Sequence, residues 1–252
     1  MPNAAPAPSI VIASRTDVGR RRDHNEDTLA VFQVQALPAR IVCVVADGMG
    51  GHLAGEVASE RAVDTIKERL AHGANGSPKR DLTDAIVAAN ARIRAEAATD
   101  AAKHGMGSTV VCVLLEGSRA LFANVGDSRG YVVTASGAEQ VTRDHAWVAE
   151  QVEMGTIAAA DAERHPYRHI LTRCLGADDN VDVETYREID LAVGDSVVLC
   201  SDGLTEHVPD DDLARVMRES ASVDSAAQRL VDLANENGGS DNISVVIARR
   251  ER

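Results

Sequence analysis

The sequence predicts an α+β fold in which antiparallel sheets carry paired helices packed on them. Strand-like and helical segments come in runs rather than in strict alternation, which argues against a doubly wound parallel sheet. Short glycine-containing turns separate several strands, and such turns favour antiparallel hairpins over long crossovers. Two helical segments each have one apolar stripe with charged residues opposite, as helices lying on a sheet do.

The first half of the chain contains strands, then two helices, then more strands. Strand composition is clear at residues 40–46, where β-branched residues predominate. In the two helical segments, apolar residues recur at steps of three and four from Ala54 to Leu70 and from Leu82 to Ile93. The predicted strands of this half are residues 9–13, 28–34, 40–46, 108–115, 119–125 and 129–134.

The second half begins with an irregular insert at about residues 145–179, which is interrupted by Gly155, Pro166 and Gly176. Asp144 is expected to cap a short helix at the start of this insert. Because it is the longest irregular segment, we expect the insert to contribute to substrate recognition. The remaining predicted elements are a strand at 196–200, a helix that carries Val223 to Ala234, and a strand at 243–247.

Length, charge and cysteine content limit the kinds of protein that this chain can be. Its 252 residues fit one large domain or two small ones; we expect one domain over residues 9–252 and a disordered tail over residues 1–8. The 26 basic and 39 acidic side chains give a net charge of −13, which disfavours nucleic acid and anionic membranes as partners. No apolar run is long enough to span a membrane, and four scattered cysteines indicate reduced thiols in the cytoplasm.

Acidic residues recur beside strand ends and glycines. Asp47, Asp127, Asp202 and Asp241 share this setting, and Glu26-Asp27 directly precedes the strand at 28–34. A single aspartate of this kind is ordinarily a turn former or a helix cap. If all of them converged, their mutual repulsion would require a divalent cation. Oxygen-only ligands select Mg²⁺ or Mn²⁺ over Zn²⁺.

The order of these motifs carries a family resemblance over about residues 14–249. The motifs are Arg22-Asp23-His24-Asn25-Glu26-Asp27, Asp47-Gly48-Met49-Gly50-Gly51, Gly107-Ser108-Thr109, Gly126-Asp127-Ser128-Arg129, Ser201-Asp202-Gly203 and Asp241-Asn242-Ile243-Ser244. As an ordered set they resemble the metal-dependent type-2C protein phosphatases, the PPM family, in its compact bacterial form. The resemblance implies a four-layer α-β-β-α sandwich with the metals at one end, between the sheets.

The resemblance also implies the roles of the acidic residues. Asp47 would bridge two Mn²⁺ or Mg²⁺ ions, and the carbonyl of Gly48 would complete the site of the first. Asp202, Asp241 and the Glu26/Asp27 pair would hold the second ion. Either residue of that pair could be the direct ligand, and Asp27 is preferred. A third, weaker ion would lie at Asp127 and Asp202.

The chemistry implied is hydrolysis of phosphoserine and phosphothreonine by in-line attack of a hydroxide that bridges two ions. Arg22 matches the arginine that grips the substrate phosphate, for which its planar fork is suited. Met49 stands where animal members carry a histidine that can protonate the leaving alkoxide, so the general acid stays open, with a metal-bound water as the simplest candidate. His165 and His169 in the insert are either near the substrate or ordinary surface residues.

The resemblance implies phosphorylated proteins as substrates and a cognate serine/threonine kinase as the opposing partner, and we expect a monomer. Two alternatives stay open at this point. One is a non-catalytic module that binds phosphoproteins, although none of the expected metal carboxylates is missing. The other is a two-metal esterase that acts on a small molecule or a nucleotide.

Overall fold

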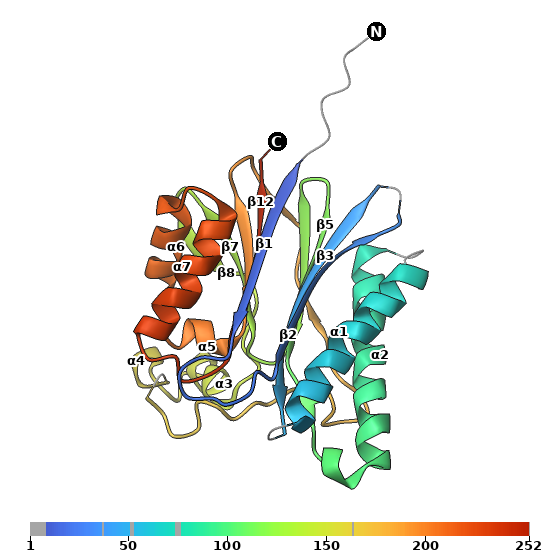
Figure 1. Ribbon diagram of the computed structural model, residues 1–252. Helices are drawn as coiled ribbons and strands as arrows, with labels where there is room; N and C mark the ends of the chain where they lie inside the picture. The colour runs from blue at the N-terminus through green and yellow to red at the C-terminus, as the bar shows by residue number, and fades with distance from the viewer. Residues whose placement is uncertain (1–8, 37, 51–52, 74–76, 163, 252) are drawn as a thin grey trace.

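Two antiparallel sheets form the centre of the computed structural model, which describes residues 9–36, 38–50, 53–73, 77–162 and 164–251 (Figure 1). The predicted tail at residues 1–8 lies outside this range, as do Gly51 and His52. The first sheet has five strands. In spatial order they are β1 (Ile10–Asp17), β12 (Ile243–Arg250), β11 (Ser196–Cys200), β7 (Arg129–Thr134) and β8 (Gly137–Gln140).

The second sheet faces the first and has seven strands. Its main path is β10 (Ile189–Asp190), β6 (Arg119–Val125), β5 (Val110–Glu116), β3 (Arg40–Met49) and β2 (Asp27–Val34). Two short strands lie off this path: β4 (Gly107–Ser108) pairs with β3, and β9 (Glu184–Thr185) pairs with β6.

Helices cover both outer faces, so the predicted four-layer α-β-β-α sandwich is confirmed (Figure 1). One pair, α1 (Leu53–Gly73) and α2 (Pro78–Thr99), lies on the β3 sheet, and the other, α6 (Asp210–Glu219) and α7 (Val223–Glu236), on the β12 sheet. The short helices are η1 (Ala101–Lys103), α3 (Trp147–Glu153), α4 (Ala159–Ala162) and α5 (Asp202–Thr205). None of the helices in the described ranges combines the length and apolar character needed to cross a membrane.

Small aliphatic side chains fill the three interfaces between the layers. Alternate residues of β3 face opposite sides, so that Val45 packs between the sheets and Val44 packs under α1 and α2. Phe122 is the largest apolar side chain between the sheets, and Tyr131 is buried under α7. The predicted helical stripe from Ala54 to Leu70 is buried against the sheet, as the spacing required.

The structure corrects the predicted elements at several places, among them a helix and the end of a strand. Helix α6 is absent from the sequence analysis, although Pro209 precedes it and three aspartates in its first turn favour a helix N-terminus. Strand β3 does not end at Ala46 but continues to Met49, because Gly48 pairs with Ser108 of β4. Asp47 therefore lies within a strand rather than just beyond one.

The β1–β12 ladder gives the sandwich two distinct ends. It runs from the pair Ile10 and Arg250 to the pair Asp17 and Ile243, and the amide of Glu251 donates to the carbonyl of Ser9 at 2.9 Å. Both described chain ends therefore lie together, and the acidic segments lie at the opposite end (Figure 1).

Candidate metal centre

A cavity of about 830 Å³ opens at the end of the sandwich where the acidic segments meet. Seven of the eight predicted site residues line it. They are Arg22, Glu26, Asp47, Gly48, Asp127, Asp202 and Asp241. The eighth, Asp27, is buried beside the cavity, where it pairs with Asp47 in the β2–β3 ladder. The fold thus brings together side chains from five separate segments of the chain.

Backbone contacts hold Asp47 rigidly at the floor of this cavity. Its amide donates to Oγ1 of Thr109 at 3.0 Å, and its carbonyl accepts from the amide of Thr109 at 2.8 Å and from Oγ of Ser108 at 3.0 Å. Oγ1 of Thr109 lies 2.7 Å from Oγ of Ser128, one residue after Asp127. The Gly-Ser-Thr motif therefore positions two of the acidic segments.

Gly48 is required by a close approach of two backbones. A Cβ atom at this position would lie 2.0 Å from the carbonyl oxygen of Gly55, in the first turn of α1. The amide of Gly48 also donates to the carbonyl of Glu26 at 3.1 Å. Any side chain here would push α1 away from the sheet.

The loop that carries Asp127 is held by His145, a residue that the sequence analysis did not assign to the site. Gly126 has φ +107°, and its amide donates to Nδ1 of His145 at 3.1 Å. Since Nδ1 is the acceptor, the proton of the neutral ring lies on Nε2, which is 2.9 Å from Oε2 of Glu184. Burial lowers the pKa of His145 and keeps the ring neutral, although its hydrogen bond with Glu184 opposes this effect.

Asp144 is not the helix cap that the sequence predicted. Ala146 occupies the N-cap position of α3 without a side-chain hydrogen bond. The carboxylate of Asp144 instead forms an ion pair with Arg129, in which Nη2 lies 2.7 Å from Oδ2. No local pattern reveals this contact, because the two residues meet only when β7 and the following loop have folded.

Asn242 ties the Arg22–Asp27 segment to the strand β12. Its Oδ1 accepts from the amide of Glu26 at 2.8 Å, and its Nδ2 donates to the carbonyls of Val18 and His24, both at 2.9 Å. Next to it, Oδ2 of Asp241 accepts from Nη2 of Arg22 at 2.6 Å. This asparagine therefore sets where Arg22 and Glu26 enter the cavity.

The electrostatics of the cluster call for a cation. Burial, followed by the charges of Asp27, Asp202, Asp127 and Asp241, raises the pKa of Asp47 well above its ordinary value. Burial and the neighbouring charge of Asp127 do the same for Asp202. Keeping several buried carboxylates ionised this close together costs free energy. Such a cluster is typical of a site in which the carboxylates bind a divalent ion.

Two buried carboxylate oxygens have no hydrogen-bond partner among the described residues. They are Oδ1 of Asp27 and Oδ1 of Asp202. An unpartnered buried oxygen is costly in a native protein unless an ion or a water contacts it. These oxygens and the carboxylates around them fit a hard divalent cation, since all the donors are oxygen atoms.

The side chains of Glu26 and Asp27 lie in two different places, one in the cavity lining and one buried beside it. Glu26 lines the cavity, and its Oε2 lies close to Gly55 at the start of α1. Asp27 lies deeper, where its Oδ2 accepts from Oγ of Ser201 at 2.7 Å. Burial, opposed by this hydrogen bond, raises the pKa of Asp27 to about 6.

The irregular insert forms one wall of the cavity. Arg168, His169, Leu171 and Cys174 line it from this side. His169 thus lies near the site, whereas His165 packs on Trp147 with ring centroids 5.1 Å apart. Met49 also lines the cavity, where it has no proton to donate.

The sequence matches a known protein family and is similar to a bacterial phosphatase over most of its length. A family model described as protein phosphatase 2C matches residues 19–242. The serine/threonine phosphatase stp of Listeria welshimeri is 39% identical over 240 residues, which are 94% of each protein.

Two solved structures are similar over nearly the whole chain. That of the serine/threonine phosphatase Stp1 from Staphylococcus aureus has a TM-score of 0.89 at 33% identity and covers 96% of this chain and 95% of its own. That of the catalytic domain of the serine/threonine protein phosphatase PstP, in complex with two manganese ions, has a TM-score of 0.83 at 32% identity, with coverage of 96% and 99%.

Proposed function

Because the chain belongs to the protein phosphatase 2C family, we propose that it is a metal-dependent phosphatase that hydrolyses phosphoserine and phosphothreonine in proteins. The observation that carries this proposal is the cavity in which the acidic residues meet beside Arg22. The relatives named as serine/threonine phosphatases support the same activity.

Two core ions, Mn²⁺ or Mg²⁺, would be held by the oxygen donors of this cavity. Asp47 and the carbonyl of Gly48 would hold the first, and Asp47, Asp202 and Asp241 would hold the second. The two manganese ions in the PstP structure support this number. When bound, such ions acidify water for in-line displacement at phosphorus and neutralise charge on the phosphoryl oxygens.

We propose Asp27, rather than Glu26, as the further direct ligand of the second ion, because its buried Oδ1 lacks a partner. A third, weaker ion would lie between Asp127 and Asp202, whose negative charges act on each other. Both assignments follow from the resemblance and are supported by the burial of these carboxylates.

Arg22 would bind the phosphate of the substrate through its planar guanidinium. Its side chain is half exposed and reaches the cavity beside Asp241. In this position it can turn from Asp241 to an incoming phosphate without leaving the site. Met49 leaves the protonation of the leaving alkoxide to water, since it cannot act as an acid.

The substrates would be phosphorylated proteins, and the opposing partner a serine/threonine kinase in the cytoplasm. All four cysteines are free thiols, which supports a reducing compartment. The insert wall around Arg168 and His169 would contribute to the choice of peptide, because it borders the cavity. We propose that the chain acts as a monomer.

The test is release of phosphate from phosphoserine and phosphothreonine peptides by the purified chain with Mn²⁺. We expect EDTA to abolish the release, and Asp47→Asn and Asp241→Asn to lose most of it while circular dichroism shows them folded. No turnover with Mn²⁺ between pH 7 and 9 would refute the proposal. Faster turnover of nucleotides than of phosphopeptides would assign the cavity to a small phosphoester instead.

A further inference from the structure

One buried histidine joins the loop of Asp127 to both ends of the insert. The amide of His145 donates to the carbonyl of Gly126 at 3.0 Å, and its carbonyl accepts from the amide of Thr172 at 2.8 Å. The side chain is almost completely buried, with 2% of its surface exposed. The first and last parts of the insert therefore meet at a residue that also contacts the loop of Asp127.

The two ring nitrogens of His145 have different partners. Nδ1 accepts from the amide of Gly126 at 3.1 Å, and Nε2 lies 2.9 Å from Oε2 of Glu184. Because an amide donates to Nδ1, the ring proton lies on Nε2 and is donated to the carboxylate. Glu184 belongs to β9 and pairs with Asn124 of β6, two residues before Gly126. The carboxylate therefore holds the ring in the tautomer that can accept from Gly126.

The backbone of Gly126 is held at both of its polar groups by this arrangement. The residue lies just beyond Val125, where β6 ends, and its amide donates to the imidazole. Its carbonyl accepts from the amide of His145 and, at 3.2 Å, from Nδ2 of Asn124. The direction in which the next residue, Asp127, leaves the strand therefore depends on the contacts between Gly126 and His145.

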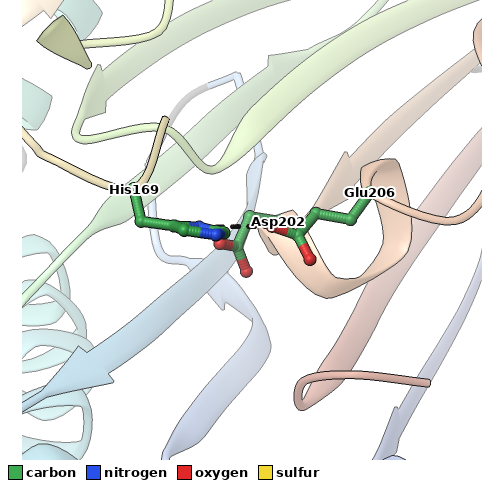
Figure 2. Close-up of side chains that lie close together, drawn as sticks. All are labelled: His169, Asp202 and Glu206. Atoms are coloured by element: carbon green, nitrogen blue, oxygen red, sulfur yellow. Dashed lines mark ion pairs between the residues drawn. The ribbon is translucent and has the colours of Figure 1, made fainter. Parts of the chain in front are cut away.

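The insert that begins at His145 also reaches a second acidic segment of the cavity. Figure 2 shows His169 of the insert beside Asp202 and Glu206, and its Nδ1 lies 3.3 Å from Oε1 of Glu206. Both side chains of this ion pair are partly exposed, and such pairs stabilise a segment only weakly. The buried junction at His145 is therefore the stronger of these two attachments between the insert and the acidic segments.

We propose that His145 is a positioning residue for Asp127. Through the bond from the Gly126 amide to Nδ1, it sets the direction of the Asp127 carboxylate and hence the affinity of that carboxylate for a divalent ion. His145 is not among the residues that line the cavity, so it acts through the backbone and not on the substrate. This role rests on the proposed function, in which Asp127 holds the third, weaker ion. Outer contacts of this kind change the affinity of a metal site without touching the ion.

Two substitutions separate the roles of the two ring nitrogens. The side-chain amide of His145→Asn ends near the position of Nδ1, so its oxygen can accept from Gly126. The longer amide of His145→Gln ends near the position of Nε2, so it can contact Glu184 but cannot accept from Gly126. Both variants keep the backbone bonds of His145 to Gly126 and Thr172. A difference between them therefore reports the contact at Nδ1.

The experiment measures Mn²⁺ binding to the full chain by calorimetry, and the solvent exchange of the Gly126 amide by NMR without metal. We expect His145→Gln to weaken the weakest Mn²⁺ site about ten-fold or more, to leave the other ions bound and to speed this exchange. His145→Asn should retain most of the affinity and the slow exchange. His104→Gln, at an exposed histidine outside the cavity lining, is the matched control and should change neither.

A double variant tests whether the effect passes through Asp127. In Asp127→Asn, the further substitution His145→Gln should cause no additional loss of Mn²⁺ affinity, because the carboxylate that His145 positions is absent. An additional loss would overturn the proposal, since the effect would then reach a different ligand.

Three other results would also overturn the proposal. One is an unchanged Mn²⁺ affinity in His145→Gln, and another is an equal loss in His145→Asn and His145→Gln, which would leave His145 with a packing role only. The third is a protonated Nδ1 in the unsubstituted chain, read from the imidazole nitrogen signals, which would exclude the bond from Gly126 even if neither variant folds. Binding and exchange need no turnover, so an inactive chain would refute the proposed function while these measurements still decide the role of His145.

Discussion

Replacing Asp127 by asparagine should stabilise the protein when metal is absent. Burial, followed by the charge of Asp144, raises the pKa of Asp127 from 3.8 to about 6. At pH 7.5 the folded chain must hold this carboxylate ionised, which costs free energy relative to the unfolded chain. Asparagine has nearly the same shape and carries no charge, so the substitution removes this cost.

The size of the effect follows from the two pKa values. A difference of about two units, at about 1.4 kcal/mol each, corresponds to about 3 kcal/mol. In a chain of this length, each kcal/mol changes the melting temperature by about 2–4 °C. We therefore expect Asp127→Asn in EDTA at pH 7.5 to melt up to about 6–12 °C higher than the unsubstituted chain.

The pH dependence has a definite sign. A carboxyl group whose pKa is raised by folding contributes stability below its unfolded pKa, and this contribution is lost as the pH rises through the folded value. The advantage of the variant should therefore be absent near pH 3.5, grow between about pH 4 and 6, and stay constant above that range. Thermal unfolding followed by circular dichroism at several pH values measures this profile.

The control is Asp64→Asn, at an exposed aspartate on α1, which should change stability by less than about 0.5 kcal/mol. A variant at Asp127 that is less stable than the unsubstituted chain in EDTA at pH 7.5 would refute the reasoning. Saturating Mn²⁺ should narrow the difference, since the bound ions stabilise the native carboxylates.

Two further predictions concern the cavity. Arg22→Ala should lower kcat/KM for phosphopeptides about 10- to 100-fold, because a charged hydrogen bond to phosphate is worth about 1.5–3 kcal/mol. Arg20→Ala is the control. An equal loss of kcat/KM in Arg20→Ala would show that Arg22 has no special role in binding the phosphate. Asp27→Asn should weaken Mn²⁺ binding more than Glu26→Gln does, since the buried Oδ1 of Asp27 lacks a partner. Calorimetry compares the two, and the reverse order would make Glu26 the ligand.

The layers of the fold and most of the cavity could be predicted from the sequence, because both depend on local patterns. The apolar stripe from Leu82 to Ile93 is buried on the sheet, and the aspartates beside glycines converge at one end. The order of the motifs identified these aspartates as metal-ligand candidates, since a single aspartate at a strand end could equally be a turn former or a helix cap. The acidic residues that the sequence predicted therefore all lie at this cavity, with Asp27 buried beside it.

What the sequence did not reveal depends on contacts between distant segments. His145 reads as an ordinary loop residue, yet its Nδ1 accepts from the amide of Gly126, nineteen positions earlier. Glu206 reads as a structural residue after the Ser201-Asp202-Gly203 motif, and only the folded insert brings His169 to it. The strand β3 reads as ending at Ala46 because Gly48 lowers strand propensity, whereas the pairing with Ser108 extends it.

The pairing of β1 with β12 makes the chain suitable for circular permutation. A short linker could join the segments near Ser9 and Glu251, whose backbones are already hydrogen-bonded. New termini could be opened in the β5–β6 hairpin at Gly117, where a Cβ atom would meet nothing within 4 Å and which lies at the same end of the sandwich. A fluorescent protein or a solid support attached there would face away from the acidic mouth.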